Sequence, residues 1–501
     1  MPETFKNLTA LLDHMKNSKP QKNGLIRIIG FVLITLLSEC AAFDPQEREK
    51  PPLDMPQSYE LYREGEPGSG AWWEVFESTE LNAFIAEALS QNFDIQSVYA
   101  RLRQAQAVAQ QVGAQKLPSL NYELEGGKSR IQTKATENTP TLIAEQETWR
   151  AGLAASYEID LWGRAGAEQR AEIVQAEAVR EDLDAAAVSV AGEVILTWLD
   201  IIAARRKMVI LREQIQTNET LLELQKLRFA NGIASGLDVS QQQQALAAAK
   251  SEMPLLELSE RQLLSQLTLL LGRASSQGLQ IQQDALPVLL DMPPTGLPAD
   301  LLASRPDVRA AGLRLRSADW EVSAARANRL PSLSLSASAA FSSGNVDLLF
   351  DNWITSLTAS LSGPLFDAGR RKAEVARTRA VAEERLADYA KTVARAIKEV
   401  EDYLVAEQYQ QDYLVLLTEQ LNAARLTLKN ASLQYQNGQS DYLSYLSAWN
   451  TIQSLERQMV AEKATLIKNR VGLYRAVGGA WVRNLMPEDS PASKPARRET
   501  T

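Results

Sequence analysis

Two long stretches without proline constrain the fold of this chain more than any other feature. The first runs from about Arg164 to Gly232 and the second from about Arg370 to Gln436. Apolar side chains recur three and four residues apart in both, which is typical of long helices packed side by side. The residues expected in these two seams are Leu183, Ala187, Val190, Val194, Trp198, Ile201, the stem of Arg205 and Met208, then Val381, Leu386, Tyr389, Val393, Ile397, Val400, Leu404 and Tyr409. At 1.5 Å per residue each helix would be about 100 Å long, so we expect an elongated, mainly helical protein.

The composition argues against several classes of function. The chain has 501 residues, of which 45% are hydrophobic, and is long enough to bury a large core. Its formal net charge is −9, with Lys and Arg scattered among the acidic residues, which does not favour a nucleic-acid partner. The single histidine is His14, so removal of residues 1–39 would leave no His-based catalysis and no imidazole metal site. Phosphate-binding glycine loops, His-Glu-x-x-His and Cys-x-x-Cys are absent from the sequence, and we expect neither an enzyme nor a metal or other cofactor.

The N-terminus has the pattern of an export signal. Basic residues precede an apolar run over 28–37, which is too short to span a bilayer as a helix but fits a signal peptide at 1–39. The run ends in Leu-Ser-Glu-Cys, which resembles the processing site of bacterial lipoproteins, so we expect a covalent lipid on Cys40. Glu39 departs from that pattern because the residue before the cysteine is normally small, and an ordinary secretory signal is the alternative. The other segments outside the folded part are a lipid-anchored linker at 40–71 and a disordered tail at 481–501.

Four segments alternate between apolar and polar residues, which predicts β-strands. These strands are expected at about 119–126, 148–161, 332–342 and 353–363. The polar stretch 126–147 between the first two strands is predicted to be a loop. Strands of about ten residues with one apolar face suit a transmembrane barrel, although a half-buried soluble hairpin gives the same pattern.

The chain repeats itself internally. Leu-Pro-Ser-Leu occurs at 117–120 and again at 330–333, and an Asn-Gly turn follows each long helix. We therefore expect two structural repeats, 72–280 and 281–480, each made of a short helix, two strands, a long helix, a tight turn and a second short helix. The two hairpin tips fall at 231–236 and 437–441. Four strands are too few to close a barrel, and open edges are not tolerated in lipid, so three copies with twelve strands would be needed. That count indicates a channel.

A set of motifs in this order resembles outer-membrane factors. The motifs are Trp72-Trp73, the two Leu-Pro-Ser-Leu segments, Asp160-Leu161-Trp162-Gly163-Arg164, Gly363-Pro364-Leu365-Phe366-Asp367-Ala368-Gly369 and the paired Asn-Gly turns. The chain is similar to NodT/OprM-type lipoproteins of resistance-nodulation-division (RND) efflux systems, which are relatives of TolC. The resemblance implies a trimer with a 12-stranded outer-membrane β-barrel, four strands per protomer, continued by a long periplasmic α-helical barrel. It also implies an exit duct for drugs or other small toxic compounds, with a periplasmic adaptor and an inner-membrane RND transporter as partners.

The resemblance also assigns roles to the two hairpin tips. In such channels the tips close the periplasmic mouth like an iris, and the matching gate candidates here are Arg228, Asp238, Asp441 and Tyr442. The tip residues expected to contact the adaptor are Asn231, Gly232, Asn437 and Gly438. Ser444 and Ser447 stand where relatives often carry an acidic ring, which is a departure from the family pattern.

Several alternatives remain open from the sequence. Asp238 and Asp441 follow turns, where aspartate is commonly a helix N-cap and no part of a gate. An outer-membrane duct of a type I protein secretion system would share the fold, and a coiled-coil tether would share the helices but lack the strands. The cargo stays undetermined among drugs, solvents and metal ions.

Overall fold

The computed structural model describes residues 43–45, 53–61, 71–133, 140, 142–289, 292, 296 and 298–478. The predicted signal peptide, Cys40, most of the linker and the predicted tail lie outside the described residues. The chain divides into two compact units. One contains Val108–Glu172 and Ser317–Ala382, and the other contains Arg48–Ala107, Ile173–Arg316 and Glu383–Thr501.

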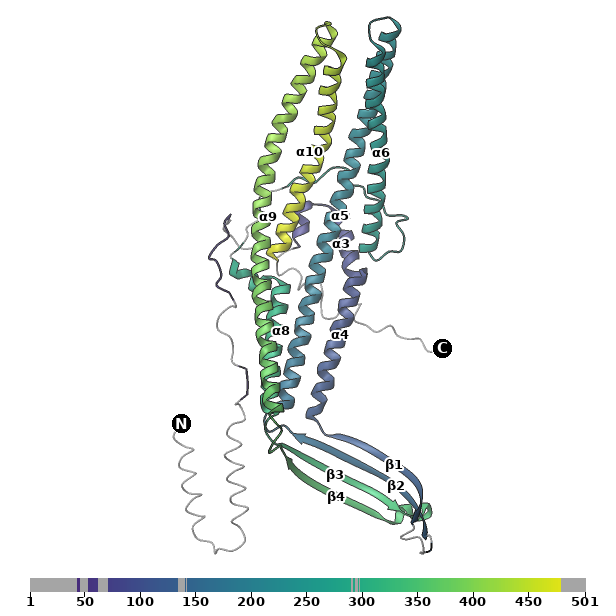
Figure 1. Ribbon diagram of the computed structural model, residues 1–501, viewed down its shortest axis with the longest axis vertical. Helices are drawn as coiled ribbons and strands as arrows, with labels where there is room; N and C mark the ends of the chain where they lie inside the picture. Colours follow the sequence, from purple (N-terminus) through teal and green to yellow (C-terminus); the bar gives the residue numbers. More distant parts are fainter. Residues whose placement is uncertain are drawn as a thin grey trace. The chain divides into compact units, whose positions relative to one another are not determined.

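The first unit contains a four-stranded antiparallel sheet with the strand order β1-β2-β3-β4 (Figure 1). Its strands are β1 Ser119–Thr133, β2 Leu142–Ile159, β3 Ser332–Ser343 and β4 Trp353–Ser362. A 3-10 helix, η5 (Val346–Asp351), connects β3 to β4, and another, η3 (Ala114–Lys116), precedes β1. The two central strands, β2 of the first repeat and β3 of the second, pair with each other, so the two hairpins form one sheet.

The register gives the sheet one apolar and one polar face. Leu120 lies opposite Ala155, Ala155 opposite Ala337, and Ala337 opposite Leu357, so one row of side chains crosses all four strands. Because successive side chains alternate between the two faces of a sheet, every second residue along each strand lies on the same face as this row. That apolar face includes Tyr122, Leu124, Ala151, Leu153, Tyr157, Leu333, Leu335, Ala339, Phe341, Trp353, Ala359 and Leu361. The opposite face is rich in small hydroxyl side chains, among them Ser156, Ser334, Ser336, Ser338, Ser356, Thr358 and Ser360.

The first hairpin is longer than the sequence predicted, and the loop expected at 126–147 is wrong over most of its length. β1 continues to Thr133 and β2 begins at Leu142. Beyond Gly126 the apolar alternation stops, but cross-strand ion pairs continue the ladder, with Lys128 Nζ 3.2 Å from Glu147 Oε1 and Arg130 Nε 3.7 Å from Glu145 Oε1. Opposite charges facing each other across a strand pair stabilise it without apolar burial.

The helices repeat in the order that the sequence predicted. The long helices α5 (Arg164–Ala230) and α9 (Arg370–Gln436) have 67 residues each. The other helices are α3 Thr79–Gln91, α4 Phe93–Gly113, α6 Gly236–Leu270, α7 Leu301–Ser304, α8 Pro306–Ala327 and α10 Tyr442–Val477, with 3-10 helices η2 Trp72–Phe76 and η4 Pro298–Asp300. Helix α6 runs back beside α5 and α10 beside α9, and both turns lie at the same end of the second unit (Figure 1).

Helix α5 supplies the main core of the second unit. Seam residues from Leu183 to Met208 are buried, with Trp198 fully enclosed, whereas Arg205 pairs with Glu260 at 2.6 Å. An 18-residue window of α5 is long and apolar enough to cross a membrane, but 67% of it is buried inside the protein, which fits a core helix. Trp72 stacks on Tyr474 with ring centroids 5.2 Å apart, and Trp72 and Trp73 are both buried, so this pair packs in the core of the second unit.

The seam of α9 differs from the prediction at one position. Val393, Ile397, Val400 and Leu404 are buried as expected, but Tyr409 is 68% exposed. The three-four spacing continues from Leu404 to Glu407, whose carboxylate is fully buried and pairs with Arg470 of α10. The prediction that Tyr409 lies in the seam is therefore wrong, because the next seam position is occupied by the buried carboxylate of Glu407.

Candidate functional site at the two hairpin tips

Both hairpin tips contain an Asn-Gly pair. Gly232 and Gly438 each have φ of +68°, a left-handed conformation that glycine adopts without steric cost. The backbone then closes each turn: Ile233 N–H donates to Arg228 O at 2.8 Å, and Gln439 N–H donates to Gln434 O at 2.8 Å. The tip residues Asn231, Gly232, Asn437 and Gly438 are all exposed.

The two candidate carboxylates at the tips cap helices. Asp238 forms a capping box at the start of α6, where Ser235 N–H donates to Asp238 Oδ2 at 2.8 Å and Asp238 N–H donates to Ser235 Oγ at 3.2 Å. Asp441 is the N-cap of α10 and accepts from Ser444 Oγ at 2.6 Å and from Ser444 N–H at 3.0 Å. These two hydrogen bonds lower the pKa of Asp441. Both carboxylates therefore have a structural role within one chain, whether or not they also contribute to a gate.

Tyr442 and Arg228 connect the two hairpins. The Tyr442 hydroxyl is buried and donates to Gln242 Oε1 of α6 at 2.6 Å. Burial, with the nearby Tyr445 and Tyr435, raises the pKa of Tyr442, so the hydroxyl keeps its proton and remains a donor at neutral pH. The Arg228 guanidinium of α5 lies 4.7 Å from the ring centroid of Tyr435 in α9, a cation–π contact.

Sequence reasoning missed a ladder of buried polar side chains below the tips, which we call the polar ladder. Gln242 Nε2 donates to Asn218 O and to Asn218 Oδ1, at 2.9 and 3.1 Å, and Trp449 Nε1 donates to the same Oδ1 at 3.2 Å. Further members are Gln214, Gln225, Tyr435, Tyr442 and Gln453. Asn218 and Gln225, seven residues apart, occupy seam spacing in α5, and a polar residue in an otherwise apolar seam is the signal that could have revealed the ladder.

The sheet provides the second functional feature, an apolar band. On β2 the band runs from Ile159 to Trp149, about 33 Å along the strand, and a barrel strand tilted by about 40° would give it a height of about 25 Å. Aromatic side chains mark one border of the band: Trp149, Phe341 and Trp353, with Phe350 packed on Phe341 at 5.3 Å. This height and aromatic border are typical of a membrane-embedded barrel wall.

The described residues contain no group of three or more His, Cys, Asp or Glu side chains that could hold a metal ion. At the tips, Asp238 and Asp441 bind serines of their own helix ends, whereas Tyr442 and Arg228 contact residues of other helices.

Comparison with known proteins identifies the family. The family model for outer membrane efflux proteins matches residues 84–273 and 297–479. The pyoverdine export outer membrane protein OpmQ of Pseudomonas aeruginosa is 30% identical over 464 residues, covering 89% of this chain and 97% of the relative. The toluene efflux pump outer membrane protein TtgF of Pseudomonas putida is 27% identical over 467 residues, covering 90% and 96%.

Solved structures share the fold. The outer-membrane channel OprN superposes with a TM-score of 0.79 at 25% identity, covering 88% of this chain and 99% of that chain. The CmeC outer membrane channel of Campylobacter jejuni, at 22% identity and a TM-score of 0.79, covers 87% and 94% and shows the fold alone. The fold is TolC-like, as the motifs predicted. With its four-stranded sheet, apolar band and paired hairpins, the chain belongs to the outer membrane efflux protein family and is an outer-membrane channel component of an efflux system.

Proposed function

We propose that three copies of this chain form the outer-membrane exit duct of a tripartite RND-type efflux pump. A periplasmic adaptor and an inner-membrane RND transporter would be its partners. The observation that supports this most strongly is the sheet, which has an apolar face of bilayer height and two outer strands, β1 and β4, with no further strand beside them among the described residues. Unpaired strand edges are costly in lipid, and closure with other copies removes them.

The proposed cargo is small organic molecules such as drugs and solvents. The relatives named above are proteins of pyoverdine export and of toluene efflux. The polar face of the sheet, with its many short hydroxyl side chains, would line the duct and offer weak, non-specific contacts. The test is to delete the gene and measure susceptibility to a panel of drugs and solvents. Increased susceptibility that the cloned gene reverses supports efflux, whereas unchanged susceptibility with loss of one secreted protein favours a type I secretion duct.

The hairpin tips are proposed to close the periplasmic mouth. Arg228 and Tyr442 tie the two hairpins of one protomer together, and Asp238 and Asp441 hold the turns in shape. Opening requires the hairpins to separate, which would break the hydrogen bond between Tyr442 and Gln242. The exposed turns at Asn231-Gly232 and Asn437-Gly438 are the proposed adaptor contacts.

Single-channel conductance in planar bilayers and vancomycin entry into cells test the gate. Tyr442→Phe should increase both, because it removes one tie between the hairpins. If Asp238→Ala combined with Asp441→Ala leaves both readouts unchanged, the carboxylates act as helix caps only. If Tyr442→Phe also changes neither, the proposed tie does not hold the mouth shut.

A lipid on Cys40 is proposed to anchor the N-terminus to the outer membrane. Radiolabelled palmitate should attach to the wild-type protein and fail to attach to Cys40→Ser. Equal labelling of the two proteins would remove the lipid from the proposal.

A further inference from the structure

The two repeats match residue by residue at constant offsets. Helix α4 and strand β1 correspond to α8 and β3 at an offset of 213 residues, and β2 and α5 correspond to β4 and α9 at an offset of 206. The registers agree: Ser119 lies opposite Ser156 in the first hairpin, and their equivalents Ser332 and Ser362 lie opposite each other in the second. For each contact between the repeats, the offsets therefore define an equivalent pair of positions, which a contact between two copies of the chain would bring together.

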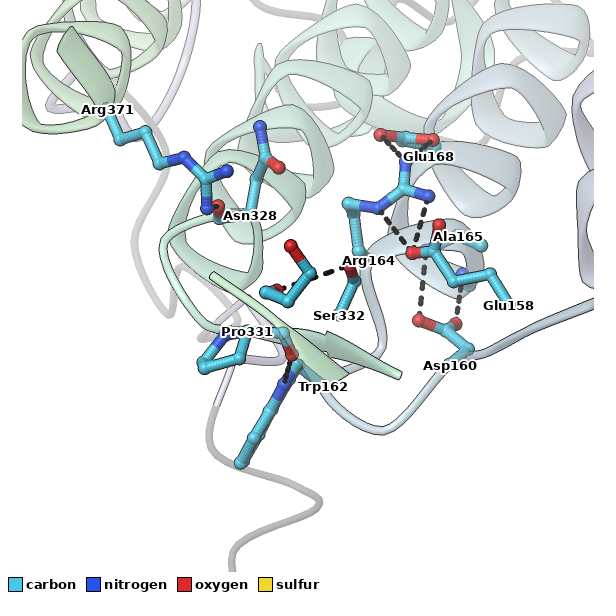
Figure 2. Close-up of polar contacts among 12 residues, drawn as sticks. Glu158, Asp160, Trp162, Arg164, Ala165, Glu168, Asn328, Pro331, Ser332 and Arg371 are labelled. Carbon is cyan, nitrogen blue, oxygen red and sulfur yellow. Dashed lines mark hydrogen bonds and ion pairs between the residues drawn. The ribbon is translucent and has the colours of Figure 1, made fainter. Parts of the chain in front are cut away.

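In the sheet unit, the contact between repeats is the pairing of β2 with β3. It continues past the strand ends, where Trp162 Nε1 of the first repeat donates to Pro331 O of the second at 2.7 Å, as Figure 2 shows. The equivalent partners of β2 and β3 are β4 and β1, which lie at opposite edges of the sheet. Every residue of β1 and β4 is exposed, whereas β3 is mostly half-buried between its neighbours.

In the helical unit, the contact between repeats includes ion pairs between α5 and α8. Arg314 binds Asp182, and Arg309 Nη2 lies 2.6 Å from Glu181 Oε2. The positions equivalent to Arg314 and Asp182 are Arg101 of α4 and Asp388 of α9. These equivalent positions therefore also carry an arginine and an aspartate. Both members are more exposed than their equivalents, the Asp388 side chain at 56% against 35% for Asp182.

The ion pair between Arg309 and Glu181 has no counterpart at the equivalent positions. Gln96 and Ala387 occupy the positions equivalent to Arg309 and Glu181. Arg101 and Asp388 thus carry opposite charges on the two equivalent surfaces, where Asp388 also lies 3.5 Å from Arg385 of its own helix.

We propose that β4 of one copy of this chain pairs with β1 of the next in the register of β2 with β3, and that Asp388 of the first copy binds Arg101 of the second. The offsets then place Ser360 opposite Glu125, Ser362 opposite Glu123 and Leu361 opposite Leu124. Leucine then lies opposite leucine on the apolar face, and serine lies opposite glutamate on the polar face. A slip of one residue would put apolar side chains on the wrong face. This inference rests on the proposed trimer and specifies its interface.

Cysteine cross-linking in isolated outer membranes tests the register. Glu125→Cys with Ser360→Cys should give disulfide-linked dimers and trimers after oxidation, since directly opposite Cβ atoms lie about 4.5–5.5 Å apart. Ala154→Cys with Ser338→Cys is the matched control within one chain and should link without changing the mass. Glu123→Cys with Ser360→Cys, two residues out of register, should not link, and each single variant shows whether Cys40 takes part. Linking of the out-of-register pair in place of the predicted one would overturn the register.

Charge reversal provides an independent test of the helical contact. Asp388→Arg should lower the temperature at which the trimer dissociates in detergent, and adding Arg101→Asp should restore it. Arg103→Asp is the control for Arg101→Asp, because Arg103 lies over the ring of Tyr99 and should not restore the trimer. Equal rescue by both variants, or by neither, contradicts the ion pair. A wild-type protein that is monomeric in detergent would instead refute the proposed function itself.

Discussion

Replacing Glu407 by glutamine should strongly lower the stability of the α9–α10 hairpin. The Glu407 carboxylate is fully buried, and Arg470 Nε donates to its two oxygens at 3.0 and 2.9 Å, with the Arg470 side chain only 3% exposed. Glutamine keeps the shape but leaves the guanidinium charge buried without its counter-charge. Breaking one partner of a buried ion pair costs about 3–5 kcal/mol. At about 2.1 cal/mol/K of unfolding entropy per residue, a chain of 501 residues changes its melting midpoint by about 1 °C per kcal/mol, so the expected fall is about 3–5 °C.

The assay is thermal unfolding of the detergent-solubilised protein followed by circular dichroism. Asp402→Asn is the matched control, because Asp402 pairs with Lys398 on the exposed surface of the same helix, where an ion pair contributes little. Glu407→Leu combined with Arg470→Leu should recover most of the loss, since it removes both buried charges. A midpoint for Glu407→Gln equal to that of Asp402→Asn, or a double variant as unstable as the single one, would refute the reasoning.

Three further predictions concern the tips and the polar ladder. Trp449→Phe should lower the melting midpoint, because it removes one of the two donors to the buried Asn218 Oδ1, a cost of about 0.5–1.5 kcal/mol since Gln242 Nε2 still donates to that oxygen; an unchanged midpoint would mean that water replaces the indole. The lowered pKa of Asp441 means that its cap is fully present above the ordinary aspartate pKa of about 3.9 and is lost only as the pH falls through the lower folded-state value. The ratio of conductance between wild type and Asp441→Asn should therefore stay constant from pH 8 to pH 5, and a midpoint inside that range would contradict the cap. Gly438→Ala should distort the second turn, which has φ of +68°, and weaken pump assembly in an adaptor pull-down; assembly equal to that of the wild type would remove the turn from the adaptor contact.

Much of the fold follows from period and repetition in the sequence. The proline-free stretches with three-four spacing predicted the ends of α5 and α9 to within two residues. The periodicity runs unbroken through each stretch and stops at an Asn-Gly turn, so each helix is expected to end there. The alternation around Trp149 and Phe341 defined the strands for a similar reason. The extension of β1 to Thr133 escaped prediction because it depends on cross-strand charge pairs, and these can be recognised only once the register is known.

The candidate site was harder to predict from sequence. Asp238 and Asp441 were recognised at the tips, but their partners Ser235 and Ser444 determine that they cap helices. Glu407 escaped attention because a charged residue on a long helix usually faces water, and only its pairing with Arg470 on another helix makes a buried position tolerable. The polar ladder could not be predicted for a similar reason, since each of its hydrogen bonds joins residues more than twenty positions apart.

The central claim is that this chain forms a trimeric outer-membrane duct. The most direct test is the mass of the detergent-extracted protein by light scattering, together with electron microscopy of the same particles. The account predicts a particle of three chains with three-fold symmetry and a detergent belt at one end. A monomer, or a particle without a detergent belt, would contradict it, because the four strands would then have no barrel to complete.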